Sequence, residues 1–276
     1  MTVAVPEGLL WWRERPGGAA WLERLPRLVG ECAAAWGLHL RAPFPRATVS
    51  FVAPAVLGDG TQAVLKVNFP DAESEHEPDA LAAWGGRGAV RLLAGDPERR
   101  ALLVERCMPG TQLWAVRDET QADRAAAGVL RALWRPLPED HAFRALDEEA
   151  RRWAAELLAS PDGPPVLVHQ DLHGGNVLRA GREAWLAIDP KPLAGERAFD
   201  VASLLRDRRG ALAADPHPVR RIAARLDRLS EALDLDRERM RRWAVVHALA
   251  WGMGDDEWFP EIVACAEWLD RARADV

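Results

Sequence analysis

The pattern of apolar residues changes at Pro109-Gly110, and this change limits the fold more than any other feature of the sequence. Before it, apolar residues occur in short runs typical of strands. After it, they recur at the spacing of an amphipathic helix. We therefore predict an α+β chain with a β-rich part over residues 1–108 and a mostly helical part over residues 109–276. A chain of 276 residues suits one large domain or two lobes.

The β-rich part carries the signature of a hairpin. Two runs over 49–57 and 62–69 flank Gly58-Asp59-Gly60-Thr61, and Asp-Gly tolerates the positive φ of a tight turn. One helix is predicted before the hairpin over 21–36 and another after it over 73–84, where Pro78 suits the first turn. Further strands are predicted over 89–95 and 100–107. The second part predicts helices over 119–135, 143–159, 198–209, 217–233, 236–252 and 257–273, with short strands near 166–168, 177–179 and 185–188.

Charge and cysteine content narrow the class of protein. The net charge of −6 argues against a nucleic-acid partner, which would favour a basic surface. Most of the acid excess lies after residue 110, where 24 basic residues face 29 acidic ones. Three widely spaced cysteines (Cys32, Cys107, Cys265) form no CxxC pair, so we expect a reduced, cytoplasmic protein. The chain shows no basic n-region with a long apolar h-region and no bilayer-length apolar run, so we expect no membrane association. The sequence specifies no oligomeric state.

The segment His169-Gln170-Asp171-Leu172-His173-Gly174-Gly175-Asn176 gathers the most chemistry. It follows a short apolar run, and its glycines permit a tight loop between Asp171 and Asn176. Asp189 ends a second apolar run, so two short strands are expected to bring the three polar side chains to neighbouring loops. One carboxylate to accept a proton, with an amide oxygen and a second carboxylate for Mg²⁺, is the set that phosphoryl transfer needs.

The β-rich part contributes Lys66 as a candidate for binding phosphate. It is one of only two lysines in the chain, and it lies in the apolar run Ala63-Val64-Leu65-Lys66-Val67. A lysine in a buried strand needs a counter-charge, which Glu75 or Glu77 of the following helix would provide. Such a lysine–glutamate pair positions the α- and β-phosphates of a nucleotide.

Six segments in this order and spacing resemble the aminoglycoside phosphotransferase family: VLKV, EHEPDAL, LLVERCMPGT, HQDLHGGNVL, IDPKP and FDVASLL. The resemblance covers about residues 38 to 270, and WGGRGAVRLL, DLHGGNVLRAG and AIDPKPL indicate the branch of streptomycin 6-kinases and hydroxyurea phosphotransferases. It implies a protein-kinase-like bilobal fold with a small antiparallel sheet and a helical second lobe. It also implies an antibiotic-resistance enzyme that uses ATP and Mg²⁺, with ATP between the lobes and a small-molecule acceptor.

The resemblance also implies roles for individual residues. Asp171 would be the catalytic base, and Asn176 and Asp189 would be the Mg²⁺ ligands. Lys66 would hold ATP phosphates, with Glu77 as its partner. The resemblance further assigns the hinge that faces adenine to Glu105 through Cys107, and support of the catalytic loop to Asp200. His169 is expected to support the same loop by packing its ring and bonding loop carbonyls.

Two positions depart from the family pattern. The loop Pro45-Arg46-Ala47-Thr48-Val49-Ser50 has no glycine, so the hydroxyl of Ser50 and backbone N–H groups are the candidates for contacting phosphate. Gln170 replaces a glycine that is common in the family, and it would either hydrogen-bond locally or narrow the acceptor site. For the acceptor itself, the candidates are His173, Trp251 as a cation–π wall, and Asp255 as an anion. Asp255 also suits the start of the last helix.

Alternatives remain open on the sequence alone. His169, Asp171 and His173 alternate along an extended stretch and would converge in a metal hydrolase, although no further ligand cluster lies nearby. The chain would also fit a kinase for another small metabolite alcohol, or a catalytically silent binding module. Lys191, just after Asp189, suits a surface position or an approach to phosphate. The acid excess of the second part favours a cationic, streptomycin-like acceptor over hydroxyurea.

Overall fold

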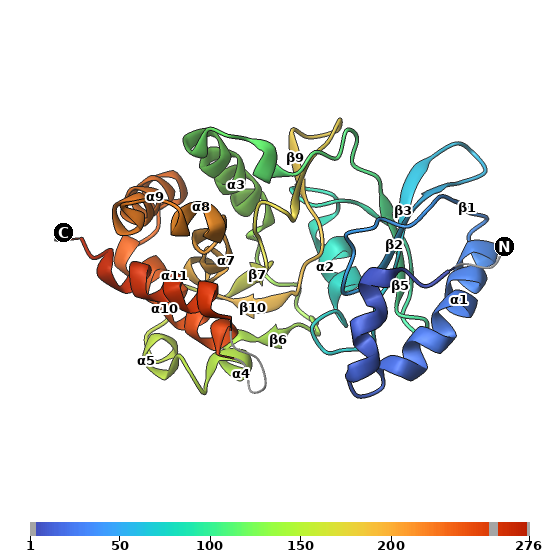
Figure 1. Ribbon diagram of the computed structural model, residues 1–276, viewed down its shortest axis with the longest axis horizontal. Helices are drawn as coiled ribbons and strands as arrows, with labels where there is room; N and C mark the ends of the chain where they lie inside the picture. The colour runs from blue at the N-terminus through green and yellow to red at the C-terminus, as the bar shows by residue number, and fades with distance from the viewer. Residues whose placement is uncertain (1–3, 254–258, 275–276) are drawn as a thin grey trace. The chain divides into compact units, whose positions relative to one another are not determined.

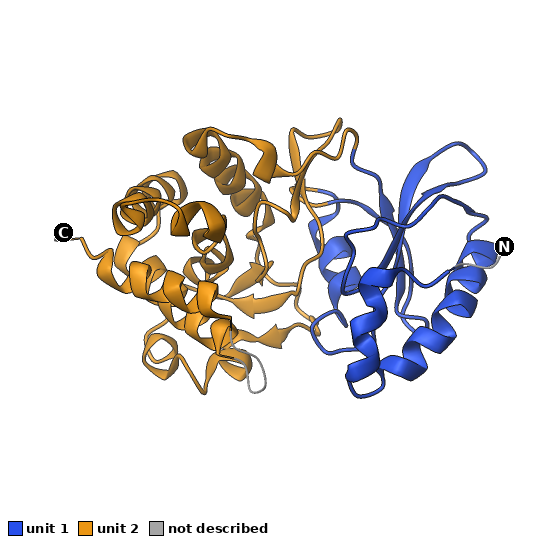
Figure 2. Ribbon diagram, viewed as in Figure 1, with its two compact units in different colours: residues 1–86, 90–107 blue, residues 87–89, 108–276 orange. Residues whose placement is uncertain are grey.

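The computed structural model describes residues 4–253 and 259–274. The chain divides into two compact units, which are coloured separately in Figure 2. Unit 1 comprises residues 1–86 and 90–107, and unit 2 comprises residues 87–89 and 108–276. Residues 87–89 join unit 2 because Ala187 N–H donates to the Gly88 carbonyl at 2.8 Å and Ala89 forms a parallel bridge with Ala187. The sequence pattern, which places Ala89 in a strand of the first part, does not predict this exchange.

Unit 1 contains one antiparallel five-stranded sheet, in the order β1-β2-β3-β5-β4. Its strands are β1 (His39–Leu40), β2 (Phe51–Val56), β3 (Gln62–Val67), β4 (Leu92–Asp96) and β5 (Ala101–Glu105). The predicted hairpin is confirmed: Phe51 pairs with Val67, and Val56 pairs with Gln62. Gly60 takes a φ of 86° in the turn, and Asp59 Oδ1 accepts the Thr61 N–H at 2.9 Å.

A hydrophobic cluster of unit 1 lies on the face of this sheet that packs against α1, which is labelled in Figure 1. Alternate residues of β3, from Ala63 through Leu65 to Val67, pack there against α1 (Gly18–Ala35) and the 3₁₀ helix η1 (Glu7–Glu14). The period of two therefore puts Val64 and Lys66 on the opposite face.

The second helix of unit 1 is shorter than predicted. The sequence predicts a helix over 73–84, but α2 runs over Glu77–Trp84. Before it, Asp71 Oδ1 accepts the Ser74 N–H at 2.7 Å, which holds the chain in a turn. Pro78 occupies the first turn, as expected, where its missing N–H costs nothing.

Unit 2 is mostly helical, with two small sheets. A three-stranded sheet has the order β6-β10-β7, and β8 pairs with β9 in a separate hairpin. The strands are β6 (Arg144–Ala145), β7 (Val166–Val168), β8 (Val177–Arg179), β9 (Trp185–Ala187) and β10 (Leu193–Gly195). The helices are η2 (Leu113–Ala115), α3 (Glu119–Leu133), α4 (Leu146–Ala150), α5 (Ala155–Leu158), α6 (Arg197–Asp200), α7 (Ala202–Leu205), α8 (Arg209–Ala213), α9 (Pro218–Leu233), α10 (Arg237–Gly252) and α11 (Pro260–Arg271).

Two predicted long helices are wrong. The stretch 143–159 begins with β6, because Arg144 pairs in parallel with Leu193 of β10, and only then forms α4 and α5. The stretch 198–209 breaks into short helices. Arg208 takes a φ of 60°, and its N–H is held by Asp207 Oδ1 at 2.8 Å. The Arg208 N–H therefore donates to a side chain in place of a backbone carbonyl of the preceding helical turn, and the helix ends there.

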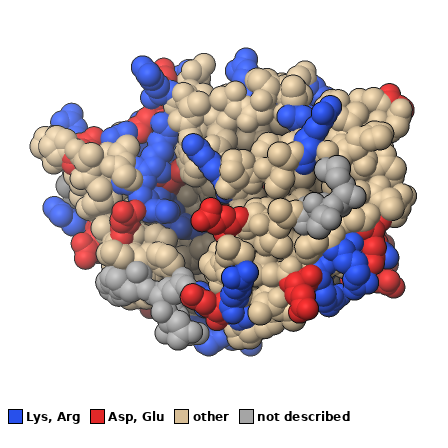
Figure 3. All heavy atoms as spheres, turned by 45° about the vertical axis from the view of Figure 1, so that its right-hand side comes forward, with Lys and Arg blue, Asp and Glu red and all other residues tan. Residues whose placement is uncertain are grey.

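Charged side chains of both signs are interspersed on the face drawn in Figure 3. Within the described residues, no helix combines the length and the apolar character needed to cross a bilayer.

Candidate active site

The catalytic-loop candidate begins at His169, directly after β7. The His169 ring is fully buried, and its Nε2 lies 3.0 Å from the Ile188 carbonyl. Burial lowers the pKa of this imidazole, which favours the neutral form with Nε2–H as the donor. His169 therefore ties the end of β7 to the end of β9.

Gln170 adopts the conformation that glycine takes most easily. Its φ is 66°, and its N–H donates to Asp200 Oδ1 at 2.7 Å. Asp200 is fully buried and also accepts the Trp134 indole N–H at 2.9 Å through Oδ2. Burial raises the pKa of Asp200, while these hydrogen bonds and His169 act in the opposite direction. The contact between Asp200 and Gln170 fixes the backbone on the N-terminal side of Asp171.

The Asp171 carboxylate contacts different groups through its two oxygens. Oδ1 lies 3.3 Å from Ser203 Oγ and 3.9 Å from Arg206 Nη2. Oδ2 lies 4.0 Å from His173 Nε2. Sequence reasoning did not single out Ser203 or Arg206. The spacing Asp200-x-x-Ser203-x-x-Arg206 was the available signal, because residues three apart share a helix face.

His173 is held by its own loop. Its Nδ1 accepts the Gly175 N–H at 3.0 Å, so in the neutral ring the proton is on Nε2, which faces Asp171. The ring also stacks on Trp114, with centroids 5.2 Å apart. A Cβ at Gly174 would lie 2.5 Å from the Trp114 ring, so this position requires glycine. Asp207, which the sequence reasoning missed, binds both the Gly174 N–H and the Trp114 indole.

Asn176 and Asp189 lie at the open end of the β8–β9 hairpin. Val177 pairs with Ala187, and Ile188 N–H donates to the Asn176 carbonyl at 2.9 Å, which brings the flanking residues together. Asn176 Nδ2 donates to the Asp171 carbonyl at 3.0 Å, so the amide oxygen is directed away from that carbonyl. An amide oxygen and an exposed carboxylate fit Mg²⁺, which needs few protein ligands and keeps several waters.

Lys66 and Glu77 form a buried ion pair within unit 1. Lys66 Nζ donates to both carboxylate oxygens of Glu77, at 2.8 and 2.7 Å. Asn68 Nδ2 also donates to Glu77 at 2.8 Å, a contact that the sequence did not predict. The other candidate, Glu75, is exposed and contacts Arg100 instead. The carboxylate thus holds the lysine on the sheet face away from the α1 core.

Ser50 is buried at the end of the loop before β2. The loop is fastened to η1, because the Trp11 and Trp12 indoles donate to the carbonyls of Thr48 and Val49 at 2.6 and 2.9 Å. The sequence did not predict this tie.

The hinge candidates lie at the end of β5. The Glu105 carboxylate accepts the Arg91 N–H at 3.0 Å, and the Glu105 N–H donates to the Arg91 carbonyl at 2.9 Å. Cys107 is buried. The side chain of Glu105 thus binds the backbone of unit 1 at Arg91.

The acceptor candidates have different surroundings from those expected. Trp251 already faces cations of the chain itself: Lys191 Nζ lies 4.7 Å and Arg206 Cζ 4.8 Å from its ring centroids. Asp255 lies outside the described residues. Over residues 4–253 and 259–274, no three His, Cys, Asp or Glu side chains gather in a way that could hold a metal ion, so the hydrolase alternative gains no support.

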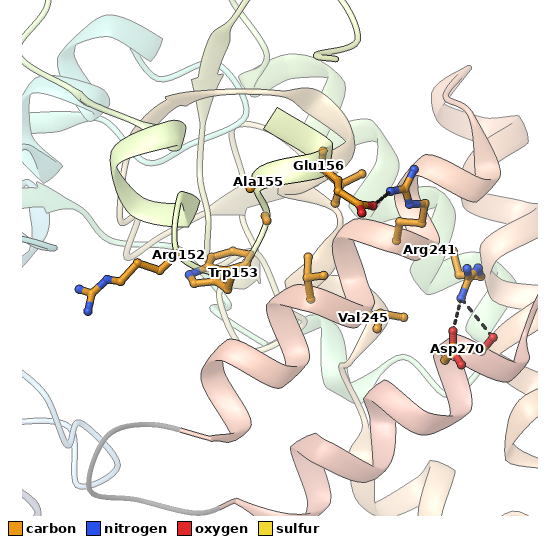
Figure 4. A pocket seen from close by; sticks show the side chains of 11 residues that line it. Arg152, Trp153, Ala155, Glu156, Arg241, Val245 and Asp270 are labelled. Atoms are coloured by element: carbon orange, nitrogen blue, oxygen red, sulfur yellow. Dashed lines mark hydrogen bonds and ion pairs between the residues drawn. The ribbon is translucent and has the colours of Figure 1, made fainter. Parts of the chain in front are cut away.

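A pocket of about 480 Å³ lies elsewhere on unit 2. It is lined by the turn before α5, which contains Trp153, by α5 itself, by residues of α10 such as Val245, and by Asp270 of α11. Ion pairs between Arg242 and Glu156 and between Arg241 and Asp270 lie beside it (Figure 4). None of the predicted site residues lines this pocket.

Comparisons with known proteins show the family of the chain. The family described as aminoglycoside/hydroxyurea antibiotic resistance kinase matches residues 35–259. A hydroxyurea phosphotransferase of Kitasatospora aureofaciens is 38% identical over 92% of this chain and 82% of its own length. A streptomycin 6-kinase of Streptomyces griseus is 36% identical over 90% of this chain and 89% of its own length.

Solved structures with lower sequence identity share the fold. An amicoumacin kinase matches with a TM-score of 0.59 at 13% identity, covering 89% of this chain and 92% of its own. An aminoglycoside phosphotransferase complexed with ADP and hygromycin B matches with a TM-score of 0.55 at 16% identity, covering 88% and 96%. The α+β, protein-kinase-like fold expected from the sequence is therefore confirmed. The chain belongs to the aminoglycoside/hydroxyurea antibiotic resistance kinase family.

Proposed function

We propose that the chain transfers the γ-phosphoryl group of ATP to a hydroxyl of a streptomycin-like aminoglycoside or of hydroxyurea. The observation that carries this proposal is the contact of Asn176 Nδ2 with the Asp171 carbonyl at 3.0 Å. It joins the proposed base to the proposed metal ligand in one loop. The family relation supports the same activity.

Asp171 is the base in this proposal. Its carboxylate orients the acceptor hydroxyl for in-line attack and takes up the hydroxyl proton. Lys66, held by Glu77, contacts the phosphates of ATP, and Ser50 is a further donor to them. The backbone from Glu105 to Cys107 contacts adenine. Most of the rate enhancement comes from positioning and electrostatics.

Mg²⁺ is the metal that this chemistry requires. Asn176 and Asp189 would hold it, and when bound it would neutralise charge on the phosphates. His169 and Asp200 support the loop that carries these groups, through the contacts with Ile188 and Gln170.

Hydroxyurea is favoured over streptomycin by one observation. The acid excess of the second part suggests a cationic acceptor, but the ring of Trp251 already faces Lys191 and Arg206. A further cation at that ring would meet like charges, whereas a small neutral acceptor would not. His173, next to Asp171, is the proposed contact for either acceptor, and Asp255 remains a candidate anion for a cationic one.

The test is a transfer assay with Mg·ATP against streptomycin, other aminoglycosides, hydroxyurea and common sugar alcohols. We expect phosphorylated hydroxyurea or streptomycin, with the faster turnover on hydroxyurea. Turnover confined to sugar alcohols would instead support a metabolic kinase. Binding of nucleotide without transfer to any acceptor would support a silent binding module.

We place the enzyme in the cytoplasm, where ATP is available. Cys32, Cys107 and Cys265 are buried and form no disulfide, which suits a reducing compartment.

A further inference from the structure

Two side chains of the segment after β10 contact one oxygen of Asp171. Ser203 Oγ lies 3.3 Å from Asp171 Oδ1, and Arg206 Nη2 lies 3.2 Å from Ser203 Oγ. The same nitrogen is 3.9 Å from Oδ1. Ser203 and Arg206 are both buried. The guanidinium thus donates to the hydroxyl and the hydroxyl donates to the carboxylate, which makes a short chain of hydrogen bonds.

We propose that Ser203 and Arg206 are positioning residues that hold Oδ1 of Asp171 and leave Oδ2 to take the acceptor proton. This inference rests on the proposed function, in which Asp171 is the base. Hydrogen bonds to a charged acceptor are stronger than neutral ones, so they fix the rotation of the carboxylate. Oδ2 then faces His173 Nε2 across 4.0 Å. A hydroxyl oxygen at that place can donate to Oδ2 and accept from the imidazole.

The burial of Arg206 supports a role beyond packing. Among the described residues, no hydrogen-bond partner meets its Nε, and its only carboxylate ion-pair partner is Asp171, at 3.9 Å. Burial lowers the pKa of this guanidinium. A buried cation that is only partly compensated reduces stability. Such an arrangement is common where a charge serves a site.

The two carboxylate oxygens then have separate tasks in the reaction. The acceptor oxygen forms a bond to the γ-phosphorus, and the bond from that phosphorus to the bridging oxygen breaks. ADP leaves with the electron pair, and the hydroxyl proton moves to Oδ2. Because Oδ1 is held, the carboxylate already has this orientation before the acceptor binds. Loss of the contacts that Ser203 and Arg206 make with Oδ1 should therefore lower kcat and leave nucleotide binding intact.

The experiment compares Ser203→Ala, Arg206→Gln and Arg206→Lys with the matched control Arg241→Gln. Arg241 is equally buried, and its ion pairs with Glu238 and Asp270 lie on α10 and α11. Each variant is assayed with Mg·ATP for transfer to streptomycin and to hydroxyurea, and for ATP hydrolysis without acceptor. Calorimetric titration measures binding of a non-hydrolysable ATP analogue, and thermal unfolding defines the assay temperature.

We expect Ser203→Ala and Arg206→Gln each to lower kcat by about 10-fold or more, with KM for ATP within about twofold of the wild type. Arg206→Lys should recover part of the loss, because it restores the cation. Arg241→Gln should lower the unfolding temperature and keep kcat.

Asp171→Asn distinguishes a failure of the proposed function from a failure of the positioning role. If it keeps wild-type turnover, the proposed function itself fails. If it abolishes turnover while Ser203→Ala and Arg206→Gln keep kcat, only the positioning role is wrong. The role is also overturned if their losses merely follow their losses of stability, as in Arg241→Gln. Should Arg206→Gln not fold, Ser203→Ala alone decides.

Discussion

At the residue scale, the ion pair of Lys66 and Glu77 is the clearest link between sequence and chemistry. Lys66 lies on the face of β3 opposite the α1 core because alternate residues of a strand point to opposite faces. The charge of the buried lysine ammonium is tolerated there because the Glu77 carboxylate balances it in place of solvent. Unit 1 thus holds a cation at a fixed place.

Glu77→Gln should destabilise the protein by about 3 kcal/mol, because it leaves the Lys66 charge buried without a counter-charge. KM for ATP should also rise, since Lys66 would lose its fixed position. Denaturant unfolding and transfer kinetics measure the two effects. The matched control is Glu75→Gln, whose carboxylate is exposed and pairs with Arg100. Equal behaviour of both variants would show that the buried pair has no special role.

His247 is the residue whose titration should affect stability most directly. It is fully buried among aromatic rings, and its ring stacks on Trp251 with centroids 5.1 Å apart. Burial, with smaller effects of Arg206 and Lys191, lowers its pKa well below 6.5. The unfolded chain binds a proton at this position at a higher pH than the folded chain does. Stability due to the neutral ring is therefore present above pH 6.5 and is lost as the pH falls below it.

His247→Phe should remove this contribution. Between pH 6.5 and 5, the unfolding free energy of the wild type should fall more steeply than that of the variant, by up to about 1.4 kcal/mol per pH unit. Chemical denaturation at a series of pH values measures both slopes. Parallel pH dependence of the two proteins would contradict the account.

At the element scale, α3 and α9 are joined by a cluster of charges. Asp123 is buried and accepts from Arg225 at 2.8 Å and from Arg228 at 2.7 Å. At the margin, Arg221 binds Glu119 and lowers its pKa. The stability gained from the Glu119 pair is present above its unfolded pKa and is lost as the pH falls towards and below 4.5.

Asp123→Asn should destabilise unit 2 by about 3 kcal/mol, because two guanidinium groups lose their shared carboxylate and one of them is buried. Thermal or denaturant unfolding measures the change. Asp147→Asn serves as the control, since its pair with Arg151 is exposed and should contribute less than about 1 kcal/mol. A loss at Asp123 no larger than at Asp147 would refute the assignment.

Helices and strands that are specified by neighbouring residues could be predicted from the sequence. Those that form by pairing with residues far along the chain could not. The Asp59-Gly60 turn and the apolar alternation around Lys66 are local, so the hairpin and the buried lysine follow from the sequence. β6 forms because Arg144 pairs with Leu193, which lies 49 residues later, and no local pattern encodes that partner. The tie between Trp12 and the Val49 carbonyl is also long-range.

The same distinction holds within the candidate site. Asp171, Asn176 and Asp189 were proposed because Asp171 and Asp189 follow apolar runs and because the three residues have the spacing of the family. Arg206 and Ser203 were missed, since their contacts with Asp171 arise only when the segment after β10 packs beside the loop. The sequence predicted that Trp251 would face a cationic ligand. It did not predict that Lys191 and Arg206 of the chain itself face this ring.

At the scale of the whole molecule, each of the two units holds some of the residues that we propose for phosphoryl transfer. Unit 1 supplies the Lys66–Glu77 pair, and unit 2 supplies Asp171, Asn176 and Asp189. Each set is organised by hydrogen bonds within its own unit. The family model matches residues 35–259 and therefore covers segments of both units.

The most direct test of the central claim compares wild type and Asp171→Ala in Mg·ATP-dependent phosphate transfer to streptomycin and hydroxyurea. The account predicts turnover by the wild type and a loss of about 100-fold or more in the variant, with binding of a non-hydrolysable ATP analogue unchanged. Equal turnover of the two proteins with every acceptor would contradict it.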